Sequence, residues 1–213
     1  MSVCCPLCLS NNVSKVQVTI NVRAYYLCHT CALVFVGSGV LPSAEQEKGR
    51  YLQHRNSIED SGYVDFLQSI IVPALPYLNA EMKGLDYGCG PAPVLAELLK
   101  GKGLSCDAYD PFFRDIPLDS KYDFIFSTEV FEHFFSPRRE CEKIISLLKP
   151  GGVLLVMTSF FPGLTSFDQW HYRRDFTHVA FYQEKTFQYI ADNFGMRIMY
   201  CDGRNKVILK KTG

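Results

Sequence analysis

A glycine-rich turn between two short apolar runs constrains this sequence more than any other feature. Residues 84–90 read GLDYGCG, so that an apolar run ends at Asp86 and leads into Gly88 and Gly90. A segment with helical spacing of apolar residues follows, and a second apolar run ends at Asp110. This order predicts a strand, a tight turn, a helix and a second strand, with the backbone of the turn close to a nucleotide-like ligand.

The residues of the turn favour the adenosine of S-adenosylmethionine (SAM) over NAD. A dinucleotide-binding turn has a third glycine, where this chain has Pro93, and Pro91 also lies in the turn. Two prolines remove two backbone N–H donors that a pyrophosphate would use. Because SAM contains no phosphate, its binding does not need those donors.

Predicted strands and helices alternate through the rest of the chain. Residues 122–134, YDFIFSTEVFEHF, predict a buried strand and then an acidic, aromatic loop, and residues 141–159 predict a helix, a Pro-Gly-Gly stop and another strand. An amphipathic helix ending at Gly195 precedes two strands joined by a DGRN turn. The fold class is therefore α/β, a doubly wound and mostly parallel sheet with a terminal antiparallel hairpin, whose ligand lies outside the carboxyl ends of the strands.

The first forty residues contain two CxxC pairs at the spacing of a zinc ribbon. Zn²⁺ prefers four thiolates in a tetrahedron, and two tight turns each present two sulfurs to one ion. Cys4 could replace Cys5 in a CxxxC pair, although Cys5 matches the spacing of the second turn. The remaining cysteines lie in apolar segments and are interpreted as small core residues. The predicted zinc ligands are Cys5, Cys8, Cys28 and Cys31.

Three regions are expected along the chain. Residues 1–40 form the zinc ribbon, 41–80 a helical linker or lid, and 81–213 the ligand-binding domain. In the middle region one helix is expected after Pro42 with Ser43 as its cap, and a second from Ser61, which Pro73 kinks or interrupts.

The blocks LDYGCGPAP, AYDPFF, YDFIFSTEVFEHF and LLKPGGVLLVMT resemble, in this order, a class I SAM-dependent methyltransferase over about residues 60–213. The front end resembles the zinc ribbons that precede some of these enzymes. The resemblance implies a Rossmann-like methyltransferase fold, SAM as cofactor and a structural zinc ion. It implies cofactor contacts from the glycine turn, from Asp110 on the ribose, from the end of the third core strand and from the segment that closes over SAM. The residues so implied are Tyr51, His54, Tyr63, Asp86, Gly88, Gly90, Asp110, Thr128 and Glu129.

One departure from the family lies after Asp110. Only about a dozen residues separate it from the next core strand, which is too short for the helix and strand that the family places there. That strand is expected to be missing or vestigial, and Phe112 is a candidate for packing on the adenine.

The acceptor side is expected in the aromatic segment 160–183, which contains the only tryptophan, Trp170, and two of the five histidines. A histidine there can act as a general base, and the same residues can instead pack a lid. Arg173 and Arg174 are either solvated or face an anionic substrate. The candidate catalytic residues are His133, His171, Tyr172 and His178, with Glu132 beside His133.

The net charge and the distribution of apolar residues limit the kinds of partner that are expected. The formal net charge is zero, which disfavours nucleic acid, and no apolar stretch is long enough to span a membrane. The first residues lack the pattern of a signal peptide, so a cytoplasmic protein is expected. The main interpretation is a methyltransferase with a small-molecule acceptor. The alternatives are an RNA or protein methyltransferase that recognises its substrate through the ribbon, and a non-catalytic interaction module.

Overall fold

The computed structural model describes residues 3–19, 23–53 and 56–213. Its strands are β1 (Val13–Val16), β2 (Tyr25–Cys28), β3 (Val34–Val36), β4 (Lys83–Tyr87), β5 (Ser105–Tyr109), β6 (Tyr122–Thr128), β7 (Leu148–Met157), β8 (Ala180–Phe181), β9 (Met196–Cys201) and β10 (Lys206–Lys211). Its α-helices are α1 (Ala44–Tyr51), α2 (Ser61–Ala74), α3 (Val94–Gly101), α4 (Pro137–Leu147), α5 (Leu164–Phe167) and α6 (Glu184–Asn193).

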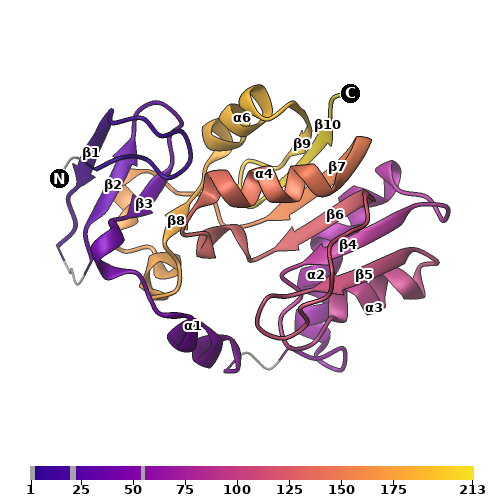
Figure 1. Ribbon diagram of the computed structural model, residues 1–213. Coiled ribbons are helices and arrows are strands. Elements are labelled where there is room, and N and C mark those ends of the chain that lie inside the picture. Colours follow the sequence, from indigo (N-terminus) through magenta and orange to yellow (C-terminus); the bar gives the residue numbers. More distant parts are fainter. Residues whose placement is uncertain (1–2, 20–22, 54–55) are drawn as a thin grey trace.

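The large sheet has six strands in the order β5-β4-β6-β7-β10-β9 (Figure 1). Strands β5, β4, β6 and β7 are parallel, and β10 pairs antiparallel with both β7 and β9. The predicted doubly wound sheet with a terminal antiparallel hairpin is confirmed.

Helices cover both faces of this sheet, and the alternation of side chains along β6 shows why. Phe124 and Phe126 pack with α2 and α3 on one face, while Ile125 packs with α4 and α6 on the other. All three side chains are fully buried. Because successive side chains of a strand point to opposite faces, a continuous apolar run is the pattern of a strand that is buried on both sides.

The segment between β5 and β6 contains neither a helix nor a strand of the sheet, as its length predicted. Residues 111–121 form turns and extended chain, and the only pairing there is an isolated bridge between Asp110 and Arg114. β5 is therefore an edge strand of the sheet.

Among the described residues, the sheet of the N-terminal region has four strands, one of which comes from far along the chain. β1, β2 and β3 form an antiparallel meander, and β8 pairs with β3 through Val34 with Phe181 and Phe35 with Ala180. The aromatic segment 160–183 thus contains α5, the 3₁₀ helix η4 (His171–Arg174) and β8. Ala180, Phe181 and Tyr182 are all buried, which favours an ordered strand over an exposed loop.

The two helices of the middle region begin at capping residues. Ser43 accepts from the Gln46 N–H at 3.3 Å and the Gln46 side chain accepts from the Ser43 N–H at 2.9 Å, which forms a capping box at α1. Asp60 caps α2 by accepting from the Tyr63 N–H at 3.2 Å. Pro73 is the next-to-last residue of α2, so the helix ends directly after this proline.

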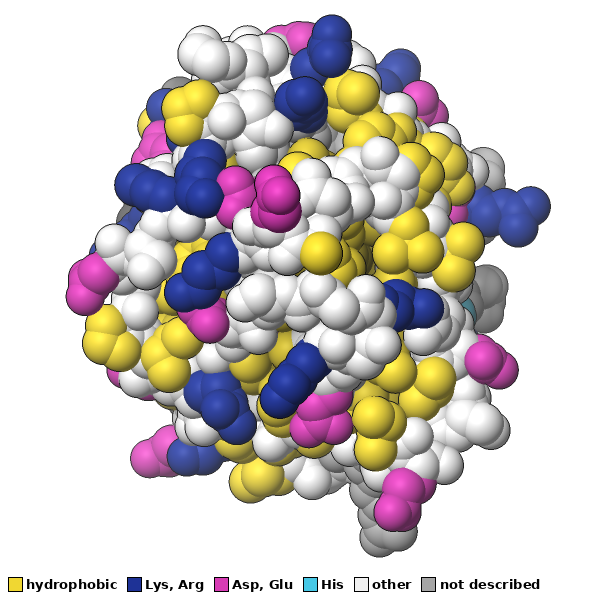
Figure 2. Space-filling model, turned by 90° about the vertical axis from the view of Figure 1, so that its right-hand side faces the viewer, with side chains coloured by type: hydrophobic (Ala, Val, Ile, Leu, Met, Phe, Trp, Pro, Cys, Tyr) yellow, Lys and Arg dark blue, Asp and Glu magenta, His cyan; other side chains and the backbone are white. Residues whose placement is uncertain are grey.

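The surface carries both signs of charge. On the face shown in Figure 2, lysine and arginine side chains are interspersed with aspartate and glutamate and do not gather into one basic patch. Within residues 3–19, 23–53 and 56–213, no helix has the length and apolar character needed to cross a bilayer.

Candidate active site

A cavity of about 1020 Å³ lies at the carboxyl ends of β4, β5 and β6. Its lining comes from the glycine turn after β4, the turn after β5, the loop after β6, the helices α1 and α2, and the segment around η4. The sequence-predicted residues that line it are Tyr51, Tyr63, Gly88, Gly90, Asp110, Phe112, Thr128, Glu129, His133, His171, Tyr172 and His178. His54 lies outside the described residues.

The two glycines of the turn have different roles. Both have positive φ, +87° at Gly88 and +66° at Gly90, where side chains are strained. A Cβ on Gly88 would lie 2.4 Å from Cγ2 of Val130, so this glycine permits close packing of the turn on the loop after β6. A Cβ on Gly90 would meet no atom within 4 Å, because Gly90 faces the open cavity.

The backbone amides of the turn are engaged within the chain. The N–H groups of Gly88 and Cys89 both donate to the Tyr109 carbonyl, at 2.8 and 3.0 Å. The Gly90 N–H donates to Oδ2 of Asp110 at 3.0 Å. Pro91 and Pro93 have no N–H, so the turn lacks the row of free donors with which dinucleotide-binding turns hold a pyrophosphate.

Asp110 and Asp86 are both buried, but only Asp110 lines the cavity. Oδ1 of Asp110 accepts from the N–H groups of Phe112 and Phe113 at 2.8 and 3.2 Å, so this carboxylate also shapes the turn after β5. Asp86 lies beneath the glycine turn, where burial and then the charge of Asp110 raise its pKa to about 7.

At the other end of the cavity, two glutamates converge on one tyrosine. Glu132 is fully buried. The Tyr172 hydroxyl lies 2.5 Å from Oε1 of Glu132 and 3.0 Å from Oε2 of Glu129, and the Thr158 hydroxyl donates to Oε2 of Glu132 at 2.8 Å. Burial and then the charge of Glu132 raise the pKa of Glu129 to about 9, so Glu129 is protonated at neutral pH.

His133 and His178 lie beside this pair of carboxyl groups, with ring centroids 4.8 Å apart. Nδ1 of His133 donates to the Thr177 carbonyl at 3.1 Å, and Nδ1 of His178 donates to the Tyr172 carbonyl at 2.7 Å. A carbonyl only accepts, so in both rings the proton is on Nδ1 and Nε2 carries a lone pair. Burial lowers the pKa of each imidazole to about 4, so both are neutral at pH 7.

The helix α1 covers the junction between the two ends of the cavity. The Tyr51 ring lies 5.1 Å from that of His133 and 5.8 Å from that of Phe112, between centroids. Nε of Arg50 pairs with Oδ2 of Asp175 at 2.8 Å, which joins α1 to the segment after η4.

Two residues of the aromatic segment lie elsewhere than expected. Trp170, in the segment expected on the acceptor side, packs against Phe167, Tyr172 and Phe181 and is not among the described residues that line the cavity. Arg173 is buried and pairs with Asp168 at 2.6 Å, whereas Arg174 is exposed and lines the cavity.

Several site residues were not predicted from the sequence. Thr158 follows the end of β7, and the rule that ligands bind at strand carboxyl ends could have found it. Glu47 lies one helical turn before Tyr51 and could have been found from it, and Arg50 directly precedes Tyr51 in the chain. The Nζ atom of Lys143 lies 4.9 Å from the centroid of the Tyr109 ring. No sequence pattern around Lys143 indicates that it belongs to the site.

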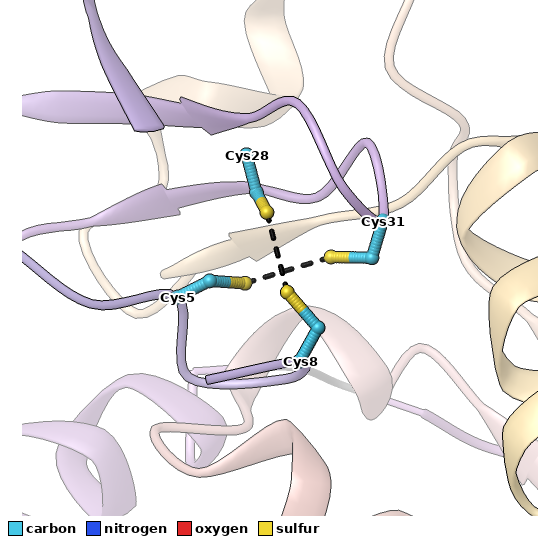
Figure 3. Close-up of side chains that lie close together, drawn as sticks. All are labelled: Cys5, Cys8, Cys28 and Cys31. Atoms are coloured by element: carbon cyan, nitrogen blue, oxygen red, sulfur yellow. Dashed lines mark hydrogen bonds between the residues drawn. The ribbon is translucent and has the colours of Figure 1, made fainter. Parts of the chain in front are cut away.

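The four cysteines of the CxxC pairs converge at the base of the N-terminal sheet (Figure 3). Their sulfurs lie within 4.8 Å of one another, with 3.5 Å between Cys5 and Cys31 and 3.3 Å between Cys8 and Cys28. Cys4 is exposed and lies outside the cluster. The donor set is that of a structural zinc site, and the thiol favoured by the spacing, Cys5, is the one in the cluster.

The strand order, the glycine turn and the cavity at the strand ends define an α/β protein with the Rossmann-like methyltransferase fold. A family model described as a methyltransferase domain matches residues 55–200, and the chain belongs to this family. No curated protein matches the sequence.

Solved structures share the fold at low sequence identity. An O-methyltransferase family protein from Burkholderia thailandensis is 17% identical with a TM-score of 0.53, over 80% of this chain and 64% of that one. Magnesium protoporphyrin IX methyltransferase (ChlM) from Synechocystis PCC 6803, with bound SAH, is 14% identical with a TM-score of 0.51, over 80% of this chain and 95% of that one. Mitomycin 7-O-methyltransferase MmcR is 13% identical with a TM-score of 0.51, over 79% of this chain and 67% of that one.

Proposed function

We propose that this chain is a SAM-dependent methyltransferase of a small-molecule acceptor, with a zinc ribbon at residues 1–40, a lid at 41–80 and the SAM-binding domain at 81–213. The observation that carries the proposal is one cavity with two chemically different ends. One end holds Gly90 and Asp110, and the other holds His133, Tyr172 and His178. The three solved structures compared above are methyltransferases by name, and one of them contains SAH.

The residues at the turn end fit the adenosine and methionine parts of SAM. The open space in front of Gly90 admits a ligand against the backbone. Oγ1 of Thr128 is buried without a hydrogen-bond partner among the described residues, at the border of the cavity. Such an orphaned hydroxyl is satisfied by a polar group of a ligand, and the methionine moiety supplies an amine and a carboxylate.

We propose that Asp110 binds the ribose through the carboxylate lone pair that is not engaged by backbone amides. A carboxylate has about four lone-pair sites, and three are engaged by the amides of Gly90, Phe112 and Phe113. One site remains for a ribose hydroxyl. Phe112 and Tyr51 provide aromatic rings beside it.

SAM supplies a methyl group on a positively charged sulfur, which an acceptor lone pair attacks in line. The contribution of the chain is to align the acceptor and to exclude water. Tyr51 and the Arg50–Asp175 pair close the cavity over the junction of its two ends. His133 and His178 present unprotonated Nε2 atoms at the acceptor end, where a proton of the acceptor can be taken.

Mass spectrometry of the purified protein, followed by calorimetry, tests the function. We expect SAM or its demethylated product to co-purify, and the emptied protein to bind SAM but not NAD. Binding of NAD in preference to SAM would overturn the proposal. Transfer of labelled methyl to RNA or protein, with affinity falling steeply as salt rises, would instead support the ribbon as a recognition module.

Asp110→Ala is expected to weaken SAM binding by roughly 1–3 kcal/mol, the range for a lost hydrogen bond to a charged group. Calorimetry measures this as a rise in the dissociation constant. Asp107→Ala is the matched control, because Asp107 lies on β5, which ends just before Asp110, and pairs with Lys83 at 2.8 Å outside the cavity lining. Equal losses in both variants would show that Asp110 acts on stability alone.

Tyr172→Phe is expected to reduce methyl transfer by about 100-fold or more, the scale on which positioned proton-transfer groups contribute, while SAM affinity changes only a few-fold. The hydroxyl is the shared hydrogen-bond partner of Glu129 and Glu132, so its removal disorders the acceptor end and leaves the glycine turn intact. The measurement compares turnover and SAM affinity. Tyr200→Phe, on the exposed strand β9, is the control and should change neither.

A further inference from the structure

Three potential metal ligands meet at the acceptor end of the cavity. A carboxylate oxygen of Glu132 and ring nitrogens of His133 and His178 lie within 4.8 Å of one another. Nε2 of His133 is 4.0 Å from Oε1 of Glu132. Glu132 and His133 belong to the 3₁₀ helix η3 (Phe131–His133) after β6, and His178 follows η4, so two separate parts of the chain supply the group.

The tautomers of the two histidines are those of metal ligands. Each Nδ1–H donates to a backbone carbonyl, of Thr177 for His133 and of Tyr172 for His178. Histidines that bind metals donate their other ring N–H in this way, which fixes the ring and leaves a lone pair for the ion. Each ring also contacts another aromatic ring, His133 that of Tyr51 at 5.1 Å and His178 that of Tyr172 at 4.2 Å.

Glu132 is a buried carboxyl group that forms no ion pair with a lysine or arginine among the described residues. Thr158 donates to Oε2 of Glu132. Oε1 of Glu132 and Oε2 of Glu129 both lie within hydrogen-bond distance of the Tyr172 hydroxyl, which has one hydrogen to give. A cation at this position would compensate a buried carboxylate that no basic side chain of the described residues neutralises.

We propose that Glu132, His133 and His178 bind a divalent transition-metal ion, with Zn²⁺ the best match. Two imidazoles and one carboxylate are the ligands of open, reactive zinc sites, whereas Mg²⁺ prefers oxygen ligands alone. Zinc-to-ligand distances of about 2.0–2.2 Å require the three side chains to close by something on the order of 1 Å. All three residues line the cavity, so the remaining coordination positions face the acceptor.

The metal site indicates a class of methyl acceptor, and this step rests on the proposed function. An open metal position facing the cavity fits an acceptor hydroxyl oxygen, whose pKa the ion lowers. With the ion bound, the Nε2 lone pairs of His133 and His178 are metal ligands, so the hydroxyl gives its proton to water and not to these histidines. An oxygen lone pair forms the new O–C bond to the methyl group, and the electrons of the broken C–S bond remain on sulfur. The acceptor class is therefore a hydroxyl compound, methylated on oxygen.

Calorimetric titration with Zn²⁺ tests the site in protein whose cysteine cluster already holds one equivalent of zinc. We expect the wild-type protein to bind a second equivalent. His178→Ala and Glu132→Gln are expected to lower the affinity for that second equivalent by at least about 100-fold, beyond the range seen when a residue supporting a metal ligand is lost. Both variants should retain the first equivalent, which shows that they are folded.

The control is His171→Ala, which removes an exposed histidine from the same cavity and should bind both equivalents. A wild-type protein that binds one equivalent only, or a His178→Ala variant that still binds two, would overturn the site. Second-site binding of Mg²⁺ in place of Zn²⁺ would overturn the choice of metal. Separate titrations with SAM keep the two proposals distinguishable: SAM binding without a second zinc rejects the metal site alone, and a second zinc without SAM binding rejects the proposed function alone.

Discussion

Replacement of Gly90 with valine is expected to abolish SAM binding, with a loss of affinity greater than 100-fold. Two effects act together. The φ of +66° places a β-branched residue in the left-handed region, at a cost of about 1–2 kcal/mol. The new side chain also occupies the open space in front of the turn, which is where the proposal puts the ligand. Calorimetry with SAM measures the loss.

Gly103→Val is the matched control for backbone strain. Gly103 has a φ of +80° and open space around it, and it lies in the turn before β5, outside the set of residues that line the cavity. We expect this variant to be destabilised to a similar extent yet to bind SAM normally. If both variants lose SAM binding equally, backbone strain alone explains the effect of Gly90→Val, and the proposed position of SAM against the turn is wrong.

Cys5→Ser is expected to release one zinc ion per chain and to lower the free energy of unfolding by several kcal/mol. Structural zinc sites contribute about 10–16 kcal/mol of apparent binding energy in small domains, and one lost thiolate leaves an incomplete tetrahedron. The N-terminal sheet has a small core of its own, so it depends on the metal. Elemental analysis measures the zinc, and denaturant unfolding measures the stability.

Cys4→Ser is the control, since Cys4 is exposed and is not one of the four clustered cysteines. This variant should keep its zinc and its stability. Retention of zinc by Cys5→Ser together with its loss from Cys4→Ser would reverse the choice between the two thiols. Absence of metal from unchelated wild-type protein would remove the zinc ribbon from the proposed function.

Local patterns in the sequence were sufficient to predict the large sheet. Apolar runs marked β4 and β6, the DGRN turn marked the β9–β10 hairpin, and the short segment after Asp110 indicated a missing strand. These features depend on residues that are close in the chain. The same holds for the capping of α1 by Ser43.

Features that depend on distant pairing could not be predicted in this way. β8 is only two residues long, and it is a strand because β3 offers a free edge. The packing of Trp170 follows from that pairing, since its ring lies against that of Phe181 in β8. The position of the Nδ1 protons on His133 and His178 depends on carbonyls that the turn around 172–178 brings to them.

The pairing of β3 with β8 has a consequence for the order of events during synthesis of the chain. Val34 leaves the ribosome long before its partner Phe181, so one edge of the N-terminal sheet remains unpaired while most of the polypeptide is being made. Unpaired strand edges invite association with other chains. Four bonds from Arg23 to the carbonyls of Arg173, Asp175, Phe176 and His178 form only with the same late segment. The N-terminal sheet is thus among the first parts to be made and the last to be completed, so nascent chains stalled before residue 181 should be the aggregation-prone form of this protein.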